Sequence, residues 1–144
     1  MILRSPQTLY FESQAGRLYY HSVGYVRLAW APERLPAATI EAYYEQVLAL
    51  LCSTGCRRIL SEHGQRAPLP VEAQQWLTTS WIPRAISLAQ TRHCAIVEGA
   101  NPMHRLSTQS IVSAAPTDFV FKRFDGLPEA ETWLLSLKYA VQAV

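Results

Sequence analysis

Alternating apolar and polar positions mark the first thirty residues of the chain as β-strands. Two short aromatic runs, 9–11 and 18–20, flank small turn residues at 14–16, and the segment 25–30 alternates strictly. Its expected buried side chains are Val26, Leu28 and Trp30. The pattern predicts an antiparallel meander whose last strand buries one face.

From Pro36 onward the apolar residues recur every three or four positions, which indicates amphipathic helices. The first helix is predicted from Pro36 to a C-cap at Gly55. The second begins near Pro70, and Pro83 predicts either a kink from Thr79 to Pro83 or two shorter helices, because proline lacks the backbone donor that a helix needs. Its inward stripe is expected to be Ala73, Leu77, Trp81, Ala85 and Leu88.

Short strands are expected between the later helices, at 56–60, 93–97 and 119–124. The run 93–97 contains apolar residues that suit burial on both faces, which predicts a place in the middle of the sheet. A third helix is predicted from an N-cap at Asn101 to about Ala114. Its inward side chains are expected to be Met103, Leu106 and Ile111, and those of a final helix Ala130, Trp133, Leu134 and Leu137.

Alternation of helix and strand after the meander predicts right-handed crossovers and a parallel sheet. The chain of 144 residues has the size of one hydrophobic core. We therefore expect a single α/β domain over residues 1–144, with a mixed five- to six-stranded β-sheet, antiparallel in its N-terminal meander and parallel afterwards. About four amphipathic helices cover it.

Composition and charge exclude several classes of protein. A net charge of +2, without glycine-rich loops or basic residues interleaved with aromatic ones, predicts no nucleic-acid partner. No apolar run reaches the roughly 18 residues that a membrane span needs, and the N-terminus lacks a signal-peptide pattern. Three cysteines, an odd number in a chain of this size, predict reduced thiols and a cytoplasmic location.

The end of the chain carries a resemblance to a known family. The segment 121–130, FKRFDGLPEA, followed by Trp133 and Leu134, together with the order of elements, resembles the STAS family and its SpoIIAA-like relatives. The resemblance implies a SpoIIAA-like fold and a small regulatory or interaction module without catalytic residues, and some members bind nucleotides or lipids. Phosphoregulated members carry Asp-Ser-(Ser/Thr)-Gly after the central strand. Here that place, 61–64, reads Ser-Glu-His-Gly, so the resemblance does not extend to a phosphorylation switch.

Three polar residues, Ser61, Glu62 and His63, follow a predicted parallel strand, where open α/β sheets usually place ligands. Neighbouring residues on a strand point to opposite faces, so these three do not form a catalytic triad by themselves, and a solvated loop is the simpler interpretation. No catalytic residue and no cofactor are predicted. A metal site made by His63, Cys94 and His104 is an alternative, but the spacings match no zinc motif, so no metal is predicted.

Trp76 lies off the inward stripe of the second helix and shares another face with Ser80, with Arg84 one turn further on. An exposed tryptophan can anchor a partner or cover a ligand cleft. The alternative is that Trp76 packs beneath the preceding loop, against residues 68–69.

The leading hypothesis is a STAS-like, non-catalytic cytoplasmic module that binds another protein, or a second copy of itself, near Trp76 and the loop 61–70. The alternative is binding or carriage of a small apolar or lipid-like ligand in a cleft between the second helix and the sheet. The candidate binding residues are Trp76, Ser80, Arg84, Ser61, Glu62 and His63.

Overall fold

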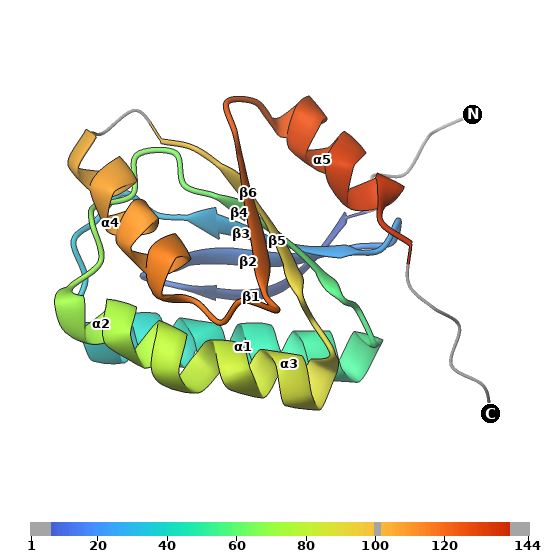
Figure 1. Ribbon diagram of the computed structural model, residues 1–144, viewed down its shortest axis with the longest axis horizontal. Coiled ribbons are helices and arrows are strands. Elements are labelled where there is room, and N and C mark those ends of the chain that lie inside the picture. Colours follow the sequence, from blue (N-terminus) through green and yellow to red (C-terminus); the bar gives the residue numbers. More distant parts are fainter. Residues whose placement is uncertain (1–6, 100–101, 139–144) are drawn as a thin grey trace.

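The computed structural model describes residues 7–99 and 102–138, in which six strands form one mixed β-sheet (Figure 1). The strands lie side by side in the order of the sequence: β1 (Gln7–Ser13), β2 (Gly16–His21), β3 (Tyr25–Trp30), β4 (Arg58–Glu62), β5 (His93–Val97) and β6 (Val120–Phe124). The pairs from β1 to β3 are antiparallel, and those from β3 to β6 are parallel. The predicted mixed sheet is confirmed.

The helices divide between the two faces of the sheet. They are α1 (Ala37–Thr54), a continuous helical run made of α2 (Val71–Trp76), the π-helical turn η1 (Leu77–Trp81) and α3 (Ile82–Ala89), then α4 (Pro102–Ala114) and α5 (Leu127–Ser136). Each parallel connection steps to the next strand in the same direction, so right-handed crossovers place α1, the α2–α3 run and α4 on one face. Helix α5 follows the last strand and packs on the opposite face (Figure 1).

The N-terminal meander and the first helix follow the predicted pattern. Val26, Leu28 and Trp30 are buried beneath the crossover helices, and Tyr25 packs on the α5 side. Helix α1 starts after Pro36 and ends at Gly55, whose φ of 70° gives the expected left-handed C-cap.

The helical run from Val71 to Ala89 stays continuous through Pro83 because it contains a π-helical turn. The Ile82 N–H donates to the Leu77 carbonyl, five residues earlier, so the α-helical hydrogen-bond pattern is already interrupted there. Pro83, which has no N–H to donate, is the next residue. The predicted inward stripe of this run is buried from Ala73 to Ala85. Leu88 is 62% exposed, contrary to the prediction, because Ala85, Ile86 and Ala89 occupy the inward side of the last turn.

Two further predictions are wrong in their details. Strand β5 has buried residues on both faces, as expected, but it is second from the sheet edge, because β6 adds only one strand beyond it. On α4, Met103 and Leu106 are 63% and 65% exposed rather than inward. The inward side chains of α4 are His104, Ser107, Thr108 and Ile111. Asn101, the predicted N-cap, lies outside the described residues.

Two apolar layers hold the fold together. The larger fills the space between the sheet and the crossover helices. The smaller lies beneath α5 and contains Tyr25, Leu60, Ala95, Ala130 and Leu134, with Trp133 and Leu137 packed at its margin, which confirms the predicted face of the final helix. None of the helices in the described part of the chain is long and apolar enough to cross a membrane.

Candidate functional site

A cavity of about 40 Å³ lies between the sheet and the crossover helices. The strand register places Leu28, Ser61 and Ile96 side by side across β3, β4 and β5, and these residues form part of its floor. Leu77 and Trp81, from the helical run, form part of the opposite wall. The polar side chains that line it are Tyr44, Ser61, His63, Arg66 and Thr108.

Arg66 is a buried cation with unpartnered donors. It belongs to the loop between β4 and α2, yet only 3% of its surface is exposed. Its guanidinium lies over the Trp30 ring, 4.3 Å from the centroid. Its Nε and Nη1 atoms are buried and have no hydrogen-bond partner, and none of the ion pairs among the described residues includes Arg66.

The titratable groups that act most strongly on the pKa of Arg66 supply no negative charge at neutral pH. Burial lowers the pKa of Arg66, but an arginine side chain stays protonated in proteins. The nearby Tyr44 hydroxyl opposes this lowering of the Arg66 pKa, and Cys94 and Tyr43 oppose it to a smaller extent. Burial raises the pKa of Tyr44 to about 12 and that of Cys94 to about 12, and it also raises the pKa of Tyr43, so all three groups are neutral.

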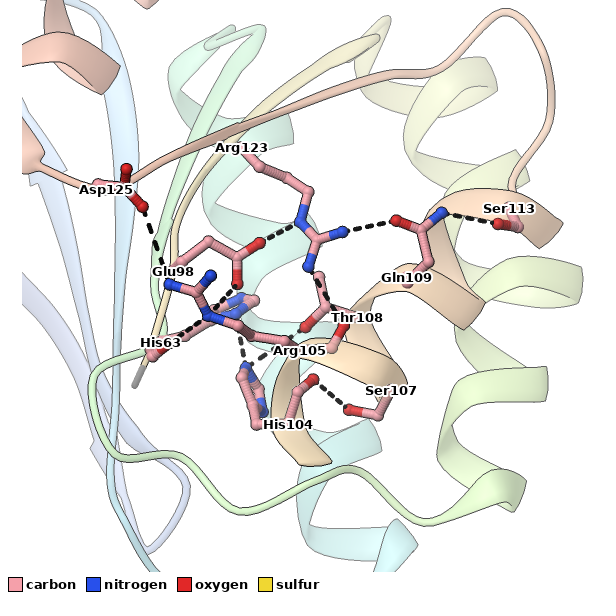
Figure 2. Close-up of polar contacts among 11 residues, drawn as sticks. His63, Glu98, His104, Arg105, Ser107, Thr108, Gln109, Ser113, Arg123 and Asp125 are labelled. Carbon is pink, nitrogen blue, oxygen red and sulfur yellow. Dashed lines mark hydrogen bonds and ion pairs between the residues drawn. The ribbon is translucent and has the colours of Figure 1, made fainter. Parts of the chain in front are cut away.

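A buried histidine pair forms the next part of the site (Figure 2). His63 follows β4 and lines the cavity, and its Nδ1 lies 2.7 Å from Nε2 of His104, on α4. The Thr108 hydroxyl lies 3.4 Å from the same His104 nitrogen. Burial, followed by the charge of Arg66, lowers the pKa of His63 well below its usual value and that of His104 to about 4. Both rings are therefore neutral at pH 7.

A network of charged side chains fixes α4 against the sheet, so that His104 reaches His63 (Figure 2). Glu98, just after β5, has a side chain only 5% exposed and pairs with Arg123 of β6. Arg123 also donates to the Gln109 side chain at 2.6 Å and to the Arg105 carbonyl at 3.2 Å. Arg105 donates in turn to the Gly99 carbonyl at 2.9 Å.

Two glycines let the loops after β4 and β5 approach closely. A Cβ atom on Gly99 would lie 2.3 Å from the Gly64 carbonyl oxygen and 3.7 Å from Cδ2 of His104. The His63 N–H also donates to the Val97 carbonyl at 3.1 Å, which continues the pairing of β4 and β5. The loop that carries His63 and Arg66 is thereby held over the ends of both strands.

The structure separates the predicted site residues that follow β4. Ser61 and His63 both line the cavity, and the Trp30 indole donates to Ser61 Oγ at 2.9 Å. Glu62 points to the opposite face of the sheet, where it pairs with Arg27. The alternation that argued against a triad of adjacent residues is thus confirmed.

The other predicted residues, Trp76, Ser80 and Arg84, belong to the helical run, and none of them lines the cavity. Trp76 is half-buried, with its ring 6.4 Å from that of Tyr44 and beneath the Arg84 guanidinium at 5.8 Å. Arg84 is held by both carboxylate oxygens of Glu45, at 2.5 and 3.0 Å. Ser80 is half-buried. Trp76 packs on α1 rather than standing fully exposed.

No metal centre is found in the residues that the structure describes, since no three of their His, Cys, Asp or Glu side chains are placed to hold an ion. His63 and His104 do meet, and Cys94 lines the same cavity as His63, but the three do not form a ligand set.

Comparisons with models of known families, with curated proteins and with solved structures found no match. The assignment of roles therefore rests on the geometry of this chain, and the STAS resemblance stays a prediction. Sequence reasoning missed Arg66 because a basic residue in a loop of helix breakers is normally solvated. The sequence feature that could have identified Arg66 was its position a few residues after the strand that ends in Ser61 and Glu62.

Proposed function

We propose that the protein binds a small organic acid, whose carboxylate pairs with Arg66 and whose apolar part lies between the sheet and the helical run Val71–Ala89. The observation that carries this proposal is the burial of Arg66 beside an apolar cavity, with Nε and Nη1 both lacking a hydrogen-bond partner. Arginine suits this role because its planar donors match the geometry of a carboxylate.

The energetics support a ligand at this position. An unpaired buried ion costs several kcal/mol, and each unsatisfied buried donor costs about 1–3 kcal/mol. The Trp30 ring and the Tyr44 hydroxyl offset part of that cost, but neither is an anion. A bound carboxylate would supply both the missing charge and the missing acceptors.

The size of the cavity favours a compact ligand. One water-sized group needs roughly 10–15 Å³ of such space, so a volume of about 40 Å³ suits an acid of a few carbon atoms. This proposal narrows the expected small apolar or lipid-like ligand to a short one with an acidic head group.

The test compares short acids with their neutral amides, using propionate and propionamide as probes in calorimetry and thermal unfolding. We expect propionate to bind and to raise the melting temperature, while propionamide does neither, because only the acid supplies a negative charge. Arg66→Met should abolish the effect. Arg92→Met is the matched control, since Arg92 is an exposed residue paired with Asp118. Equal binding of acid and amide, or full binding by Arg66→Met, would contradict the proposal.

A STAS-like role in protein interaction is a second proposal, supported by the order of elements and by the segment 121–134, in which β6 is followed by helix α5. Its cytoplasmic location is supported by the cysteines, because Cys52, Cys56 and Cys94 form no disulfide. Trp76 offers less contact surface than expected, because Arg84 and Tyr44 cover part of it. Light scattering of the wild-type protein and Trp76→Ala tests self-association, and an unchanged dimer in the variant would exclude Trp76 from the contact.

A further inference from the structure

We propose, on the basis of the carboxylate-binding function above, that the ligand is a monocarboxylic acid with a short hydrocarbon tail, and that Cys94 sets the length of this tail. Cys94 lies on β5, is 6% exposed and lines the same cavity as Arg66. The carboxylate meets the unpartnered Nε and Nη1 atoms of Arg66, and the last carbon of the tail contacts the Cys94 thiol.

The cavity lies where the sheet carries small side chains. Across β4, β5 and β6 the register aligns a row of three residues that line the cavity: Ile59, Cys94 and Phe121. Cys94 and Ser61, which belongs to the neighbouring row, have the two smallest side chains among the residues that line the cavity. A close-packed core leaves open space only where side chains lack volume. The space therefore follows the line from Ser61 to Cys94.

The Ser61 end of this space is polar. The Arg66 guanidinium lies over the Trp30 ring, and the Trp30 indole N–H donates to Ser61 Oγ at 2.9 Å. Cys94 comes two residues before Ile96, the β5 residue beside Ser61, and so lies roughly 6.6 Å nearer the amino ends of the parallel strands. A carboxylate bound at Arg66 therefore directs the rest of the ligand toward Cys94.

The Cys94 end of the space is apolar. Its neighbours in the row, Ile59 and Phe121, have hydrocarbon side chains, and a buried thiol behaves as a small apolar group. Leu77 adds a further apolar surface from the opposite wall. Such surroundings match methyl and methylene groups, because a polar tail would lose its hydrogen bonds with water and gain none in return.

The charges around the cavity select one carboxylate rather than two. Among the described residues that line it, Arg66 carries the only guanidinium or ammonium group, and no Asp or Glu side chain is present. His63 also lines the cavity, but burial lowers its pKa well below the usual value, so its ring is neutral at pH 7. A second carboxylate would therefore be buried without a cation, which is unfavourable.

The volume limits the tail to a few carbon atoms. A water-sized group needs roughly 10–15 Å³ of such space, so a volume of about 40 Å³ holds about three or four groups, namely a carboxylate and about two or three carbon atoms. Propionate and butyrate fit this description. The additional carbon of pentanoate would collide with the Cys94 side chain.

Calorimetric titration of the full chain with acetate, propionate, butyrate and pentanoate at pH 7.5 measures the length limit. We expect the affinity to rise about fourfold for each carbon from acetate to butyrate, as burial of one methylene provides, and to fall at pentanoate. Succinate, which has as many carbon atoms as butyrate, should bind at least about tenfold more weakly than butyrate because its second charge is unpaired. A further gain in affinity at pentanoate, or equal binding of succinate and butyrate, would overturn the inference.

The variant that tests the role of Cys94 is Cys94→Ala, which replaces the thiol with a hydrogen atom and leaves room for one more carbon. Pentanoate should then bind more tightly than butyrate, the reverse of the order in the wild-type protein. Cys56→Ala is the matched control, because Cys56 is equally buried, at 7% exposure, but does not line the cavity. If Cys94→Ala kept the wild-type order, or if Cys56→Ala reversed it, Cys94 would not set the length.

A measurement on the wild-type protein tests the orientation of the ligand without any variant. In nuclear Overhauser spectra with butyrate labelled with ¹³C at its methyl group, this methyl should show contacts to the β protons of Cys94 and to the Phe121 ring. Contacts to the Trp30 ring in their place would put the tail at the cationic end and overturn the inference.

The outcomes separate the inference from the function beneath it. If the acids bind, Arg66→Met abolishes their binding and the order of affinities is the same in the wild-type protein and Cys94→Ala, the carboxylate function stands and the length limit at Cys94 fails. If none of the monocarboxylic acids binds the wild-type protein, both proposals fail.

Discussion

His63 and His104 are 41 residues apart in the chain, yet their nearest ring nitrogens lie 2.7 Å apart and their rings meet at 87°. One nitrogen must donate and the other must accept, so the contact needs at least one neutral ring. Both residues are buried, at 3% and 1% exposure, and Arg66 adds a positive charge nearby. The pair is therefore a point at which acid should weaken the fold.

The free energy of unfolding should fall as the pH drops from 7.5 to 5.5. In the folded protein the pKa values of His63 and His104 lie below the ordinary value of 6.5. Below about pH 6.5 the unfolded chain therefore binds protons at these histidines that the folded chain does not bind. The slope can reach about 1.4 kcal/mol per pH unit for each such histidine, and it should vanish above pH 7. Urea unfolding at several pH values measures it.

The control for this prediction is a protein in which the pair is replaced, His63→Gln combined with His104→Gln. The variant should retain only the weaker dependence due to His21 and His93, whose pKa values are also lowered by burial. If the free energy of unfolding fell equally steeply with pH in the wild type and the variant, groups other than this histidine pair would be responsible for the acid sensitivity.

Arg66→Met should stabilise the ligand-free protein by about 1–3 kcal/mol, because it replaces an unpaired buried cation with an apolar side chain of similar length. Urea unfolding in a buffer without carboxylates measures the change. Arg92→Met should stay within about 1 kcal/mol of the wild type, since it removes only an exposed ion pair. A loss of stability in Arg66→Met would mean that the arginine serves the fold rather than a ligand.

Gly99→Ala should destabilise the protein by about 1–3 kcal/mol and weaken acid binding. The added Cβ would meet the Gly64 carbonyl oxygen at 2.3 Å and force away the loop that carries His63 and Arg66. Urea unfolding and calorimetry with propionate measure the two effects. Gly55→Ala is the control: it has a φ of 70° but open space around its Cβ, so we expect about 1 kcal/mol of destabilisation and unchanged binding. If Gly99→Ala bound propionate normally, the loop would not depend on this close approach.

The sequence predicted the parts of this protein that depend on local periodicity. Alternation in 25–30 identified a strand with one buried face, and Pro36 and Gly55 marked the ends of α1. The order of strands and helices was enough to predict a mixed sheet, because right-handed crossovers leave few alternatives. Ser61 and His63 were found as candidates because the carboxyl end of a parallel strand has a known position in such folds.

Tertiary structure alone decided how α4 is turned and where Arg66 lies. Periodicity placed Met103 and Leu106 inward, but the contact with His63 and the pairing of Glu98 with Arg123 hold the His104 face of α4 against the sheet instead. Likewise Arg66 is buried because its loop folds back over Trp30. Such contacts join residues distant in sequence, and their free energy depends on partners that no local pattern contains.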